Sequence, residues 1–574
     1  MKKGLIFILL IPTLCFAQSE IILSGGNQSN IEQAITDFNN SNNGYGTITI
    51  KGNILIQQNL NIPSKVTLNI LTGNKFIVSN GKSLEIKGQV LSTTSQIFET
   101  TTENHNIRIF NQSVYPEWFG LISYQDSSIT DDKPTIQKAI NSLVTGGEII
   151  FNGNQYLIGA VINITTASIT LKGKRTYFAG LDNTNNFIAI NNNVPSMFLV
   201  GEYGVRFNDL NFEGYIPNFS SDNANNNINN HTKGENTINK AISFIRTNNS
   251  KDLDGEVTGC SFKNFKHCIY GRGANLNIIE NTFTASYNGV YIQGAQHIDQ
   301  NKHLARTRGH RILKNRFHSL GGSSKHITLV GSNCIKIEAE PYTNFGVVSE
   351  TYTVRGFYNE ISDNYSDDCK TFFEGIIDRT KIDGNLILYS GGTAIKATGG
   401  LYGTIINNII DGSHTFNPHK LYPFKDCNDN SDNECDTFNF PSGHGIHIQY
   451  AHNSTIHNNQ ILNKRFHGIY LERSKNSSIQ SNTIRNFNRH SYIKISGKNP
   501  ENNDPILYSG IHIENIENTS YNIQNIVANN TISITHTGIQ ARYGIYAGDG
   551  DNDNFIKNNF ILPVRLIDKI KIEN

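Results

Sequence analysis

The sequence has little of what helical bundles, nucleic-acid-binding proteins and membrane proteins need. Its 574 residues include one Trp, two Met and 13 Pro, whereas Asn, Ile, Gly and Thr dominate, a composition that argues against packed helices. The formal net charge is only +1, so no bulk field attracts nucleic acid or anionic membranes. After the first residues, no apolar stretch approaches the roughly 20 residues of a transmembrane helix. We therefore expect neither a nucleic-acid partner nor membrane insertion.

The first residues follow the pattern of a secretory signal. Lys2 and Lys3 precede an apolar run from Leu5 to Leu14, which is followed by Cys15-Phe16-Ala17. This pattern predicts a signal peptide over residues 1–17. Lipid attachment at Cys15 would require a small residue directly before the cysteine. Leu14 stands at that position and therefore argues against a lipoprotein. We expect an exported monomer, either periplasmic or secreted.

The other cysteines predict few disulfides. Export would permit such bonds, but only Cys427 and Cys435, which bracket a polar loop, suggest a pair. The other four lie within strand-like segments, where we expect buried free thiols: Cys260, Cys268, Cys334 and Cys369.

An internal repeat predicts the architecture. An aliphatic residue is followed three positions later by Asn and two further on by Ile or Phe, as in Ile382-x-x-Asn385-x-Ile387. Uninterrupted copies are spaced by about one turn of a three-stranded solenoid. Inward aliphatic side chains would fill the cylinder, while Asn would stack its amide on the next Asn and tolerate a left-handed backbone at a bend. We predict an all-β fold, a right-handed parallel β-helix. The repeat asparagines are Asn281, Asn315, Asn385, Asn408, Asn459, Asn482, Asn530 and Asn559, with weaker copies at Cys260 and at residues 361–366.

The same pattern suggests how the chain is divided. We assign residues 18–112 to an N-terminal β-rich cap with the first coils, and residues 113–574 to the β-helix. Long insertions between repeats predict loops that could wall a cleft, where functional residues often lie. These loops are expected at Pro217–Asn239, Gln296–Arg308, Glu340–Val354, Gly412–Pro441 and Gly497–Leu507.

Three segments resemble the opening of pectate-lyase-like proteins. They are Tyr115-Pro-Glu-Trp-Phe-Gly, Thr130-Asp-Asp-Lys-Pro-Thr-Ile-Gln-Lys-Ala-Ile and Gly146-Gly-Glu-Ile-Ile-Phe. In that superfamily a short helix leads into the first coils. The resemblance implies the fold from about Tyr115 onward. It implies no single activity, because lyases, hydrolases, epimerases and phage tailspikes share this opening.

A second strand type predicts a row of outward polar side chains. Segments such as His444-Gly-Ile-His-Ile-Gln alternate apolar and polar residues, which turns the residue between the two apolar positions outward. Stacked coils then bring these residues about 4.8 Å apart, in a row that we call the polar ladder. Its predicted members are Tyr291, Lys336, Lys396, His447 and Tyr470, with Gln293, Glu338, Thr398, Gln449 and Glu472 two residues further along each strand. Lys494 and His512 belong to the same face, but segments 491–496 and 509–514 compete for one position.

The polar ladder concentrates side chains that suit β-elimination from a uronic acid. Such an enzyme must neutralise the substrate carboxylate, remove a weakly acidic proton and protonate the leaving oxygen. Lys396, Arg473 or Lys494 would pair the carboxylate, and His447 or Tyr470 would act as the base with its neighbour as the acid. The remaining ladder residues would bind an acidic poly- or oligosaccharide, for example an ulvan or alginate type of uronate: Lys336, Glu338, Gln449, Glu472, Tyr291 and His512. The same steps would serve a polysaccharide lyase or a dehydratase.

Hydrolysis is a second possible reaction. The segment Asp367-Asp368-Cys369 and the segment Ser442-Gly-His444-Gly resemble parts of polygalacturonase-type inverting hydrolases. The Asn-Thr-Asp and Arg-Ile-Lys segments of that family are missing, so we interpret Asp367 and Asp368 as a turn pair.

The same residues also allow calcium-assisted elimination or glycan binding without catalysis. No cofactor is certain, but pectate-lyase relatives often use Ca²⁺, and Glu338, Glu340 and Asp378 could contribute ligands. A non-catalytic carbohydrate-binding protein would instead present Tyr291, Tyr470 and Tyr546 as platforms. An ordinary solvated sheet face is the alternative that assigns these side chains no function.

Overall fold

A computed structural model describes most of the chain as two compact units, each presented by itself. The described residues are 19–100, 106–153, 155–173, 186–191, 194–215, 240–245, 253–293, 309–318, 320, 333–338, 358–367, 369–390, 392–412, 443–464, 466–487, 508–514, 524–535, 541–548, 554–562 and 566–572. The five predicted loops apart from Gly412, the signal peptide, Cys427, Cys435 and Lys494 lie outside these ranges. In the described part of the chain, no helix is long and apolar enough to cross a membrane.

Unit 1 takes in residues up to Ile122 together with Pro134–Gly147. Its helix α1 (Gln28–Ser41) is capped by the Asn27 side chain, which accepts from the Ser29 N–H, and it buries Ile31 and Phe38. Short parallel strands form three small sheets, so this unit is itself coiled. They are β1 (Glu20–Leu23), β3 (Gly46–Ile50), β6 (Val66–Ile70) and β9 (Val90–Ser92), then β2 (Gly26–Asn27), β4 (Ile54–Ile56), β7 (Phe76–Val78) and β10 (Phe98–Thr100), then β5 (Leu60–Ile62), β8 (Ser83–Ile86) and β11 (Asn106–Ile109). β12 (Ser113–Val114), η1 (Pro116–Phe119) and α2 (Lys133–Ser142) follow, and α2 is the short helix that the pectate-lyase-like resemblance implies.

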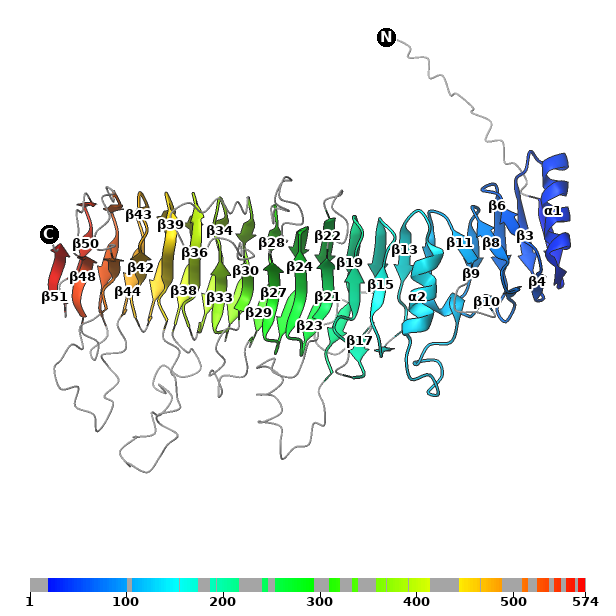
Figure 1. Ribbon diagram of the computed structural model, residues 1–574, viewed down its shortest axis with the longest axis horizontal. Coiled ribbons are helices and arrows are strands. Elements are labelled where there is room, and N and C mark those ends of the chain that lie inside the picture. The colour runs from blue at the N-terminus through cyan, green and yellow to red at the C-terminus, as the bar shows by residue number, and fades with distance from the viewer. Residues whose placement is uncertain are drawn as a thin grey trace, which may run out of the picture. The chain divides into compact units, whose positions relative to one another are not determined.

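Unit 2 is a three-sided parallel β-helix, in which each strand pairs with the strand one coil later (Figure 1). The first sheet contains β13 (Gly147–Ile150), β16 (Ile169–Lys172), β19 (Val205–Asn208), β22 (Leu253–Thr258), β25 (Ala274–Ile279), β28 (Arg311–Leu313), β31 (Glu360–Ser362), β34 (Lys381–Asp383), β37 (Thr404–Ile406), β40 (Thr455–His457), β43 (Ser478–Gln480), β46 (Ile526–Ala528) and β49 (Phe555–Lys557). The second contains β14 (Gln155–Ile158), β17 (Asn186–Ala189), β20 (Asn211–Glu213), β23 (Ser261–Lys263), β26 (Thr282–Thr284), β29 (Arg316–His318), β32 (Tyr365–Asp367), β35 (Leu386–Leu388), β38 (Ile409–Asp411), β41 (Gln460–Leu462), β44 (Thr483–Arg485), β47 (Thr531–Ser533) and β50 (Phe560–Ile561).

The third sheet of unit 2 carries the outward residues of interest. It contains β15 (Ile162–Ile164), β18 (Phe198–Val200), β21 (Lys240–Ile245), β24 (His267–Arg272), β27 (Asn288–Gln293), β30 (Asn333–Glu338), β33 (Thr371–Gly375), β36 (Ile395–Leu401), β39 (Ile446–His452), β42 (Ile469–Glu472), β45 (Ile511–Glu514), β48 (Ala541–Ala547) and β51 (Leu566–Ile572). Parallel strands joined by such crossovers wind in a right-handed sense. The prediction of a right-handed parallel β-helix is therefore confirmed.

Inward side chains form a continuous core along unit 2. Ile382, Ile405 and Ile456 are fully buried at equivalent positions of successive first-sheet strands. The second sheet stacks aromatic rings in the same way, with the Phe262 and Phe283 centroids 5.1 Å apart and nearly parallel. Each coil thus covers the apolar surface of its neighbour, which no coil could bury alone.

The repeat asparagines form a buried amide ladder at the turn between the first and second sheets. At Asn408, the backbone N–H and the side-chain Nδ2 both donate to Asn459 Oδ1 at 3.0 Å, and Nδ2 also donates to the Ile382 carbonyl. The same bonds recur from Asn281 to Asn559, and Asn364 belongs to the series. Amide stacking is therefore confirmed, and it satisfies backbone groups that the turn would otherwise leave buried without partners.

We predicted that the repeat Asn adopts the left-handed backbone conformation of this turn. This prediction is wrong, because the residue before the repeat Asn adopts it. Glu280, Lys314, Asn407 and Asn458 have φ between 55° and 57°. The repeat Asn instead uses its side chain for hydrogen bonds inside the turn, which a left-handed, outward position would not permit. The prediction assigned both the left-handed backbone and the amide hydrogen bonds to the repeat Asn, whereas two neighbouring residues provide them.

The four cysteines within the coils are buried free thiols, as predicted. Burial raises the pKa of the Cys260 and Cys268 thiols to about 12. At the first position of the amide ladder, Cys260 replaces Asn, and its backbone N–H donates to Asn281 Oδ1 at 2.9 Å.

Lys464 is a buried cation at the turn between the second and third sheets. Its ammonium donates to Ser390 Oγ at 2.7 Å and to the Gly392 carbonyl at 3.2 Å, both two coils earlier. Burial lowers the pKa of Lys464 to about 7. The folded chain therefore holds a lysine that releases its proton near neutral pH.

Replacing one amide of the ladder should destabilise the fold strongly. We expect Asn459→Ala to lower the free energy of unfolding by about 3 kcal/mol, because the Asn408 donors and the Ile405 carbonyl would lose their partners. The matched control is Asn458→Gly, since Asn458 is exposed with φ 55° and Gly suits that backbone. Urea denaturation of both variants tests this, and equal losses would contradict the ladder's role.

Lys464 should make stability depend on pH in the alkaline range. Between about pH 7 and the ordinary lysine pKa of about 10.4, the unfolded chain binds more protons than the folded chain, so stability rises with pH. The variant Lys464→Met lacks the ammonium group and therefore lacks this contribution to the pH dependence of stability. The melting temperature of the wild type minus that of Lys464→Met should therefore become more positive from pH 7 to pH 9. A constant difference across that range would show that the buried ammonium keeps its proton.

Candidate active site

The third sheet aligns the polar ladder in one register. Its strands place Tyr270, Tyr291, Lys336, Glu374, Lys396, His447, Tyr470, His512 and Tyr546 at equivalent positions of successive coils. The predicted order of its members is confirmed, and β45 shows that His512, not segment 491–496, follows Tyr470. Whether these residues act in catalysis stays a prediction.

Glu374 is a ladder residue that the sequence interpretation missed. It lies between Lys336 and Lys396, and Lys396 Nζ is 3.1 Å from Glu374 Oε1. Its strand reads Thr-Phe-Phe-Glu-Gly and lacks the alternating Ile of the other coils. The spacing from Asn364 to Asn385 could have revealed it, because that interval leaves room for a complete coil.

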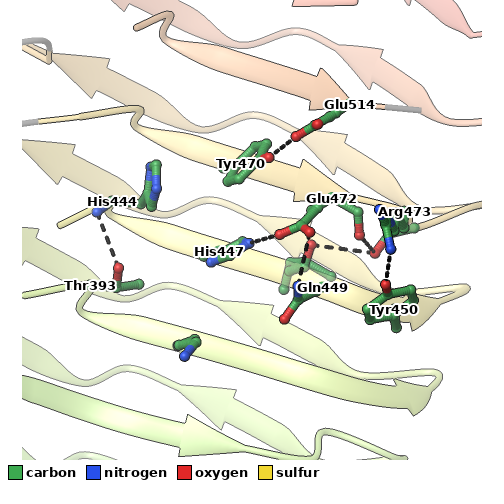
Figure 2. Close-up of polar contacts among 12 residues, drawn as sticks. Thr393, His444, His447, Gln449, Tyr450, Tyr470, Glu472, Arg473 and Glu514 are labelled. Carbon is green, nitrogen blue, oxygen red and sulfur yellow. Dashed lines mark hydrogen bonds and ion pairs between the residues drawn. The ribbon is translucent and has the colours of Figure 1, made fainter. Parts of the chain in front are cut away.

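A carboxylate on the next coil holds the imidazole of His447. His447 Nε2 lies 3.0 Å from Glu472 Oε2, and Gln449 Nε2 donates to Glu472 Oε1 at 2.9 Å. Figure 2 shows these three side chains pointing toward one another. Only 12% of the His447 side chain is exposed. The carboxylate therefore fixes the orientation of a ring that is largely withdrawn from water.

Burial keeps His447 neutral at neutral pH. Desolvation lowers its pKa, the Glu472 hydrogen bond and charge oppose that effect, and Lys396 adds to it. A neutral imidazole that donates Nε2–H to Glu472 carries its lone pair on Nδ1. His447 is thus arranged as a proton acceptor at Nδ1.

Tyr470 lies next to this imidazole and has its own carboxylate. The His447 and Tyr470 rings stack with centroids 4.7 Å apart at 19°. The Tyr470 hydroxyl donates to Glu514 Oε2 on β45 (Figure 2). An imidazole and a phenol, each held by a carboxylate one coil later, therefore sit side by side.

Three further histidines surround the pair. His444 stacks on His467 with centroids 5.2 Å apart at 6°, and His467 lies 4.3 Å from His512. Burial lowers the pKa of all three, that of His512 to about 4. His467 Nδ1 accepts from the Ser509 N–H at 2.8 Å, so its proton is on Nε2. These rings pack against the His447–Tyr470 pair.

The cationic residues predicted to bind the acidic substrate already contact protein groups. Lys336 pairs with Glu338, which also accepts from the Tyr291 hydroxyl. Arg473 is exposed with φ 50°, and its guanidinium donates to the Tyr450 hydroxyl while stacking over that ring. An ammonium has three donors and a guanidinium five, so each can take a further oxygen. Lys494 lies outside the described residues.

The residues of the hydrolase interpretation do not come together, because Asp367 and His444 belong to different sheets. Asp367 is on β32 of the second sheet, where its carboxylate contacts His318 Nδ1 at 2.5 Å and the Tyr365 hydroxyl at 3.1 Å. His444 precedes β39 of the third sheet, and its N–H donates to Thr393 Oγ1 at 3.3 Å (Figure 2). Asp368 lies outside the described residues.

Two of the three suggested calcium ligands lie in the described part of the chain, and both contact other protein groups. Glu338 holds Lys336 and Tyr291, and Asp378 accepts from the Leu401 N–H at 3.1 Å. Glu340 lies outside the described residues. Among the residues that the structure describes, no group of three or more His, Cys, Asp or Glu side chains could hold a metal ion. Calcium binding stays a prediction, and we assign no step to it.

Comparisons with known proteins add structural likeness at low identity. No protein-family model matches the chain, and no curated protein matches it significantly. Among solved structures, it is similar to DFA-IIIase from Arthrobacter chlorophenolicus, with 11% identity over 81% of this chain and 99% of that chain, at a TM-score of 0.46. It is also similar to a GH87 alpha-1,3-glucanase from Streptomyces thermodiastaticus, with 12% identity, 75% and 66% coverage and a TM-score of 0.38.

A third solved structure is the mannuronan C-5 epimerase A-module from Azotobacter vinelandii, with 11% identity, 76% and 96% coverage and a TM-score of 0.36. Because the three TM-scores are low, the likenesses carry no argument about activity. The architecture follows from the strand register itself. The chain is a right-handed parallel β-helix, which is the architecture that its opening segments imply.

Proposed function

We propose that this protein is a carbon–oxygen lyase that cleaves acidic glycans by β-elimination next to a uronic acid. One observation carries the proposal: a neutral His447, held at Nε2 by Glu472, is stacked against a Tyr470 hydroxyl held by Glu514. Base and acid must lie within one sugar unit of each other for elimination. Neighbouring coils, about 4.8 Å apart, supply that separation.

The steps balance with these two groups alone. His447 Nδ1 takes the C5 proton of the uronate, the C5 electron pair forms the C4–C5 double bond, and the C4–O bond breaks. Tyr470 gives its proton to the departing oxygen, which leaves a phenolate on Tyr470 and an imidazolium on the stacked His447 ring. Proton exchange with water then restores both groups. Glu472 stabilises the imidazolium that forms on His447.

The cationic side chains around His447 and Tyr470 would neutralise the substrate carboxylate. Lys396 is the partner of His447 on the preceding coil, and Arg473 follows directly after Glu472. Both can donate to a substrate carboxylate without leaving their protein partners. Lys494 could assist them, as we predicted from the sequence.

The rest of the polar ladder would bind neighbouring sugars. Tyr291, Lys336, Glu338, Gln449 and His512 share the face with the proposed catalytic pair. Their mixture of hydroxyl, ammonium, amide and ring groups suits a polyhydroxylated, acidic chain. We propose that the protein meets such polymers after export, acting in the periplasm or outside the cell.

One observation favours hydrolysis as a second candidate function. Glu472 and Glu514 occupy equivalent positions on adjacent strands, about 4.8 Å apart along the coil axis. A pair of neighbouring carboxyl groups is what most glycosidases use for hydrolysis. A hydrolase would release reducing ends without forming an unsaturated product.

Product analysis with site variants tests the proposed elimination. With ulvan, alginate and polygalacturonate as substrates, we expect ultraviolet absorbance from the conjugated double bond. His447→Ala and Tyr470→Phe should each lower kcat by at least about 100-fold, because each removes one proton-transfer group. His457→Ala on the first sheet and Tyr365→Phe on the second are matched controls. Reducing ends without absorbance would select the hydrolase, and full activity of both ladder variants would move the site elsewhere.

The pH dependence of kcat/KM tests which atom is the base. Since burial lowers the pKa of His447, the acidic limb should lie below the ordinary histidine value of about 6.5. Glu472→Gln removes the group that raises this pKa, so the limb should move to still lower pH while the plateau falls. Glu360→Gln, which alters an ion pair with Arg311 on the first sheet, is the control. An unmoved acidic limb in Glu472→Gln would exclude His447 as the base.

A further inference from the structure

Three exposed residues form a stack at the corner between the third and first sheets. Tyr358, Arg379 and Tyr402 occupy one position in three successive coils, two residues before the start of the first-sheet strands β31, β34 and β37. The Arg379 guanidinium carbon lies 5.6 Å from the Tyr358 ring centroid and 6.0 Å from that of Tyr402. Its Nη1 also donates to the Tyr358 hydroxyl at 3.3 Å. We call this set the corner stack.

The corner stack is strongly exposed to solvent. Tyr358 is 67% and Tyr402 is 55% exposed, and Arg379 is exposed as well. Packing in the core explains why aromatic residues are buried. It does not explain two exposed tyrosine rings on either side of an arginine. The surface therefore presents two apolar ring faces with a positive charge between them.

The backbone at this corner makes these residue types costly. Tyr358, Arg379 and Tyr402 have φ of 59°, 46° and 62°, in the left-handed region that bulky side chains rarely adopt. The next two coils place Asn453 and Asn476 at the same position, with φ of 54° and 55°. Asn is the residue that tolerates this conformation best after Gly. Folding alone would therefore favour Asn in all five coils.

We infer that the corner stack binds a carboxylated glycan, as a site separate from the proposed catalytic pair. Tyrosine ring faces pack on the apolar faces of sugars, and a guanidinium fits a carboxylate with two parallel hydrogen bonds. The three groups repeat once per coil, about every 4.8 Å, a spacing similar to that of sugars along an extended polymer. Uncharged glycans would gain the ring contacts without the charge pairing.

The position in the chain links this site to the polar ladder. Arg379 follows Glu374, and Tyr402 follows Lys396, each shortly after the strand that carries the ladder residue. The substrate class rests on the proposed function, since a long acidic polymer that reacts at the ladder would be held a second time at the corner. The binding itself does not need the elimination to occur.

Direct binding with matched variants tests the corner stack. The probes are short oligogalacturonates and oligoalginates, each compared with its carboxyl-reduced form, in calorimetric titrations of the full chain. We expect Arg379→Ala and Tyr402→Asn each to weaken one class of binding site about tenfold for the acidic probes. Arg316→Ala removes a Tyr–Arg contact on the second sheet, at 5.6 Å, and should leave binding unchanged.

A second readout separates a binding role from a structural one. Tyr402→Asn should keep or raise the melting temperature, because Asn suits φ 62° better than Tyr. Weaker binding together with unreduced stability supports the inference. Unchanged binding in both corner variants overturns it, as does a wild type that binds none of the acidic probes.

The same titrations distinguish this inference from the proposed reaction. They are repeated in His447→Ala, in which the proposed base is missing. Corner-dependent binding without any unsaturated product from the wild type would keep the corner site and reject the lyase. Unsaturated product with no effect of Arg379→Ala or Tyr402→Asn on binding would keep the lyase and reject the corner site.

Discussion

Hydrogen bonds between stacked asparagine amides hold the coils of unit 2 in one register. Each amide oxygen takes two donors from the preceding Asn, and each amide nitrogen returns a bond to a backbone carbonyl. A slip by one residue would break these bonds and turn the inward isoleucines to solvent. Because a buried donor or acceptor without a partner costs about 1–3 kcal/mol, the ladder penalises any such slip at every coil. The alignment of outward residues on the third sheet depends on this fixed register.

Fixed register turns a repeated strand into a row of paired groups. An imidazole or a phenol of one coil can reach a carboxylate on the next coil, as His447 reaches Glu472 and Tyr470 reaches Glu514. Burial by the neighbouring rings lowers the pKa of His447, whereas Glu472 limits that decrease. The two effects together leave a neutral imidazole with a defined tautomer. Neither would arise on an isolated strand, since both need the coil that follows.

Sequence alternation predicted which side chains face outward, but not how they pair. The Asn repeat and the period-2 pattern were sufficient for the fold and for the order of Lys396, His447 and Tyr470. Glu374 was missed because its strand uses Phe and Gly where other coils use Ile. His444 was assigned only to the hydrolase interpretation and His467 was missed, because both lie at the bend before the strand, where no alternation applies. The left-handed position was assigned one residue too late, since propensity alone cannot tell which Asn supplies backbone tolerance and which supplies hydrogen bonds.

The corner stack shows where the fold gives up stability. A bulky residue in the left-handed region costs roughly 1–2 kcal/mol, so Tyr358, Arg379 and Tyr402 together cost about 3–6 kcal/mol relative to an unstrained backbone. Two exposed cation–π contacts contribute only about 0.5–1 kcal/mol each. The contacts therefore offset less than the strain, whereas the asparagines of the next two coils largely avoid that cost. A solenoid tolerates such a local deficit because the amide ladder and the core of the same coils are unaffected by it, which leaves these outward positions free for recognition.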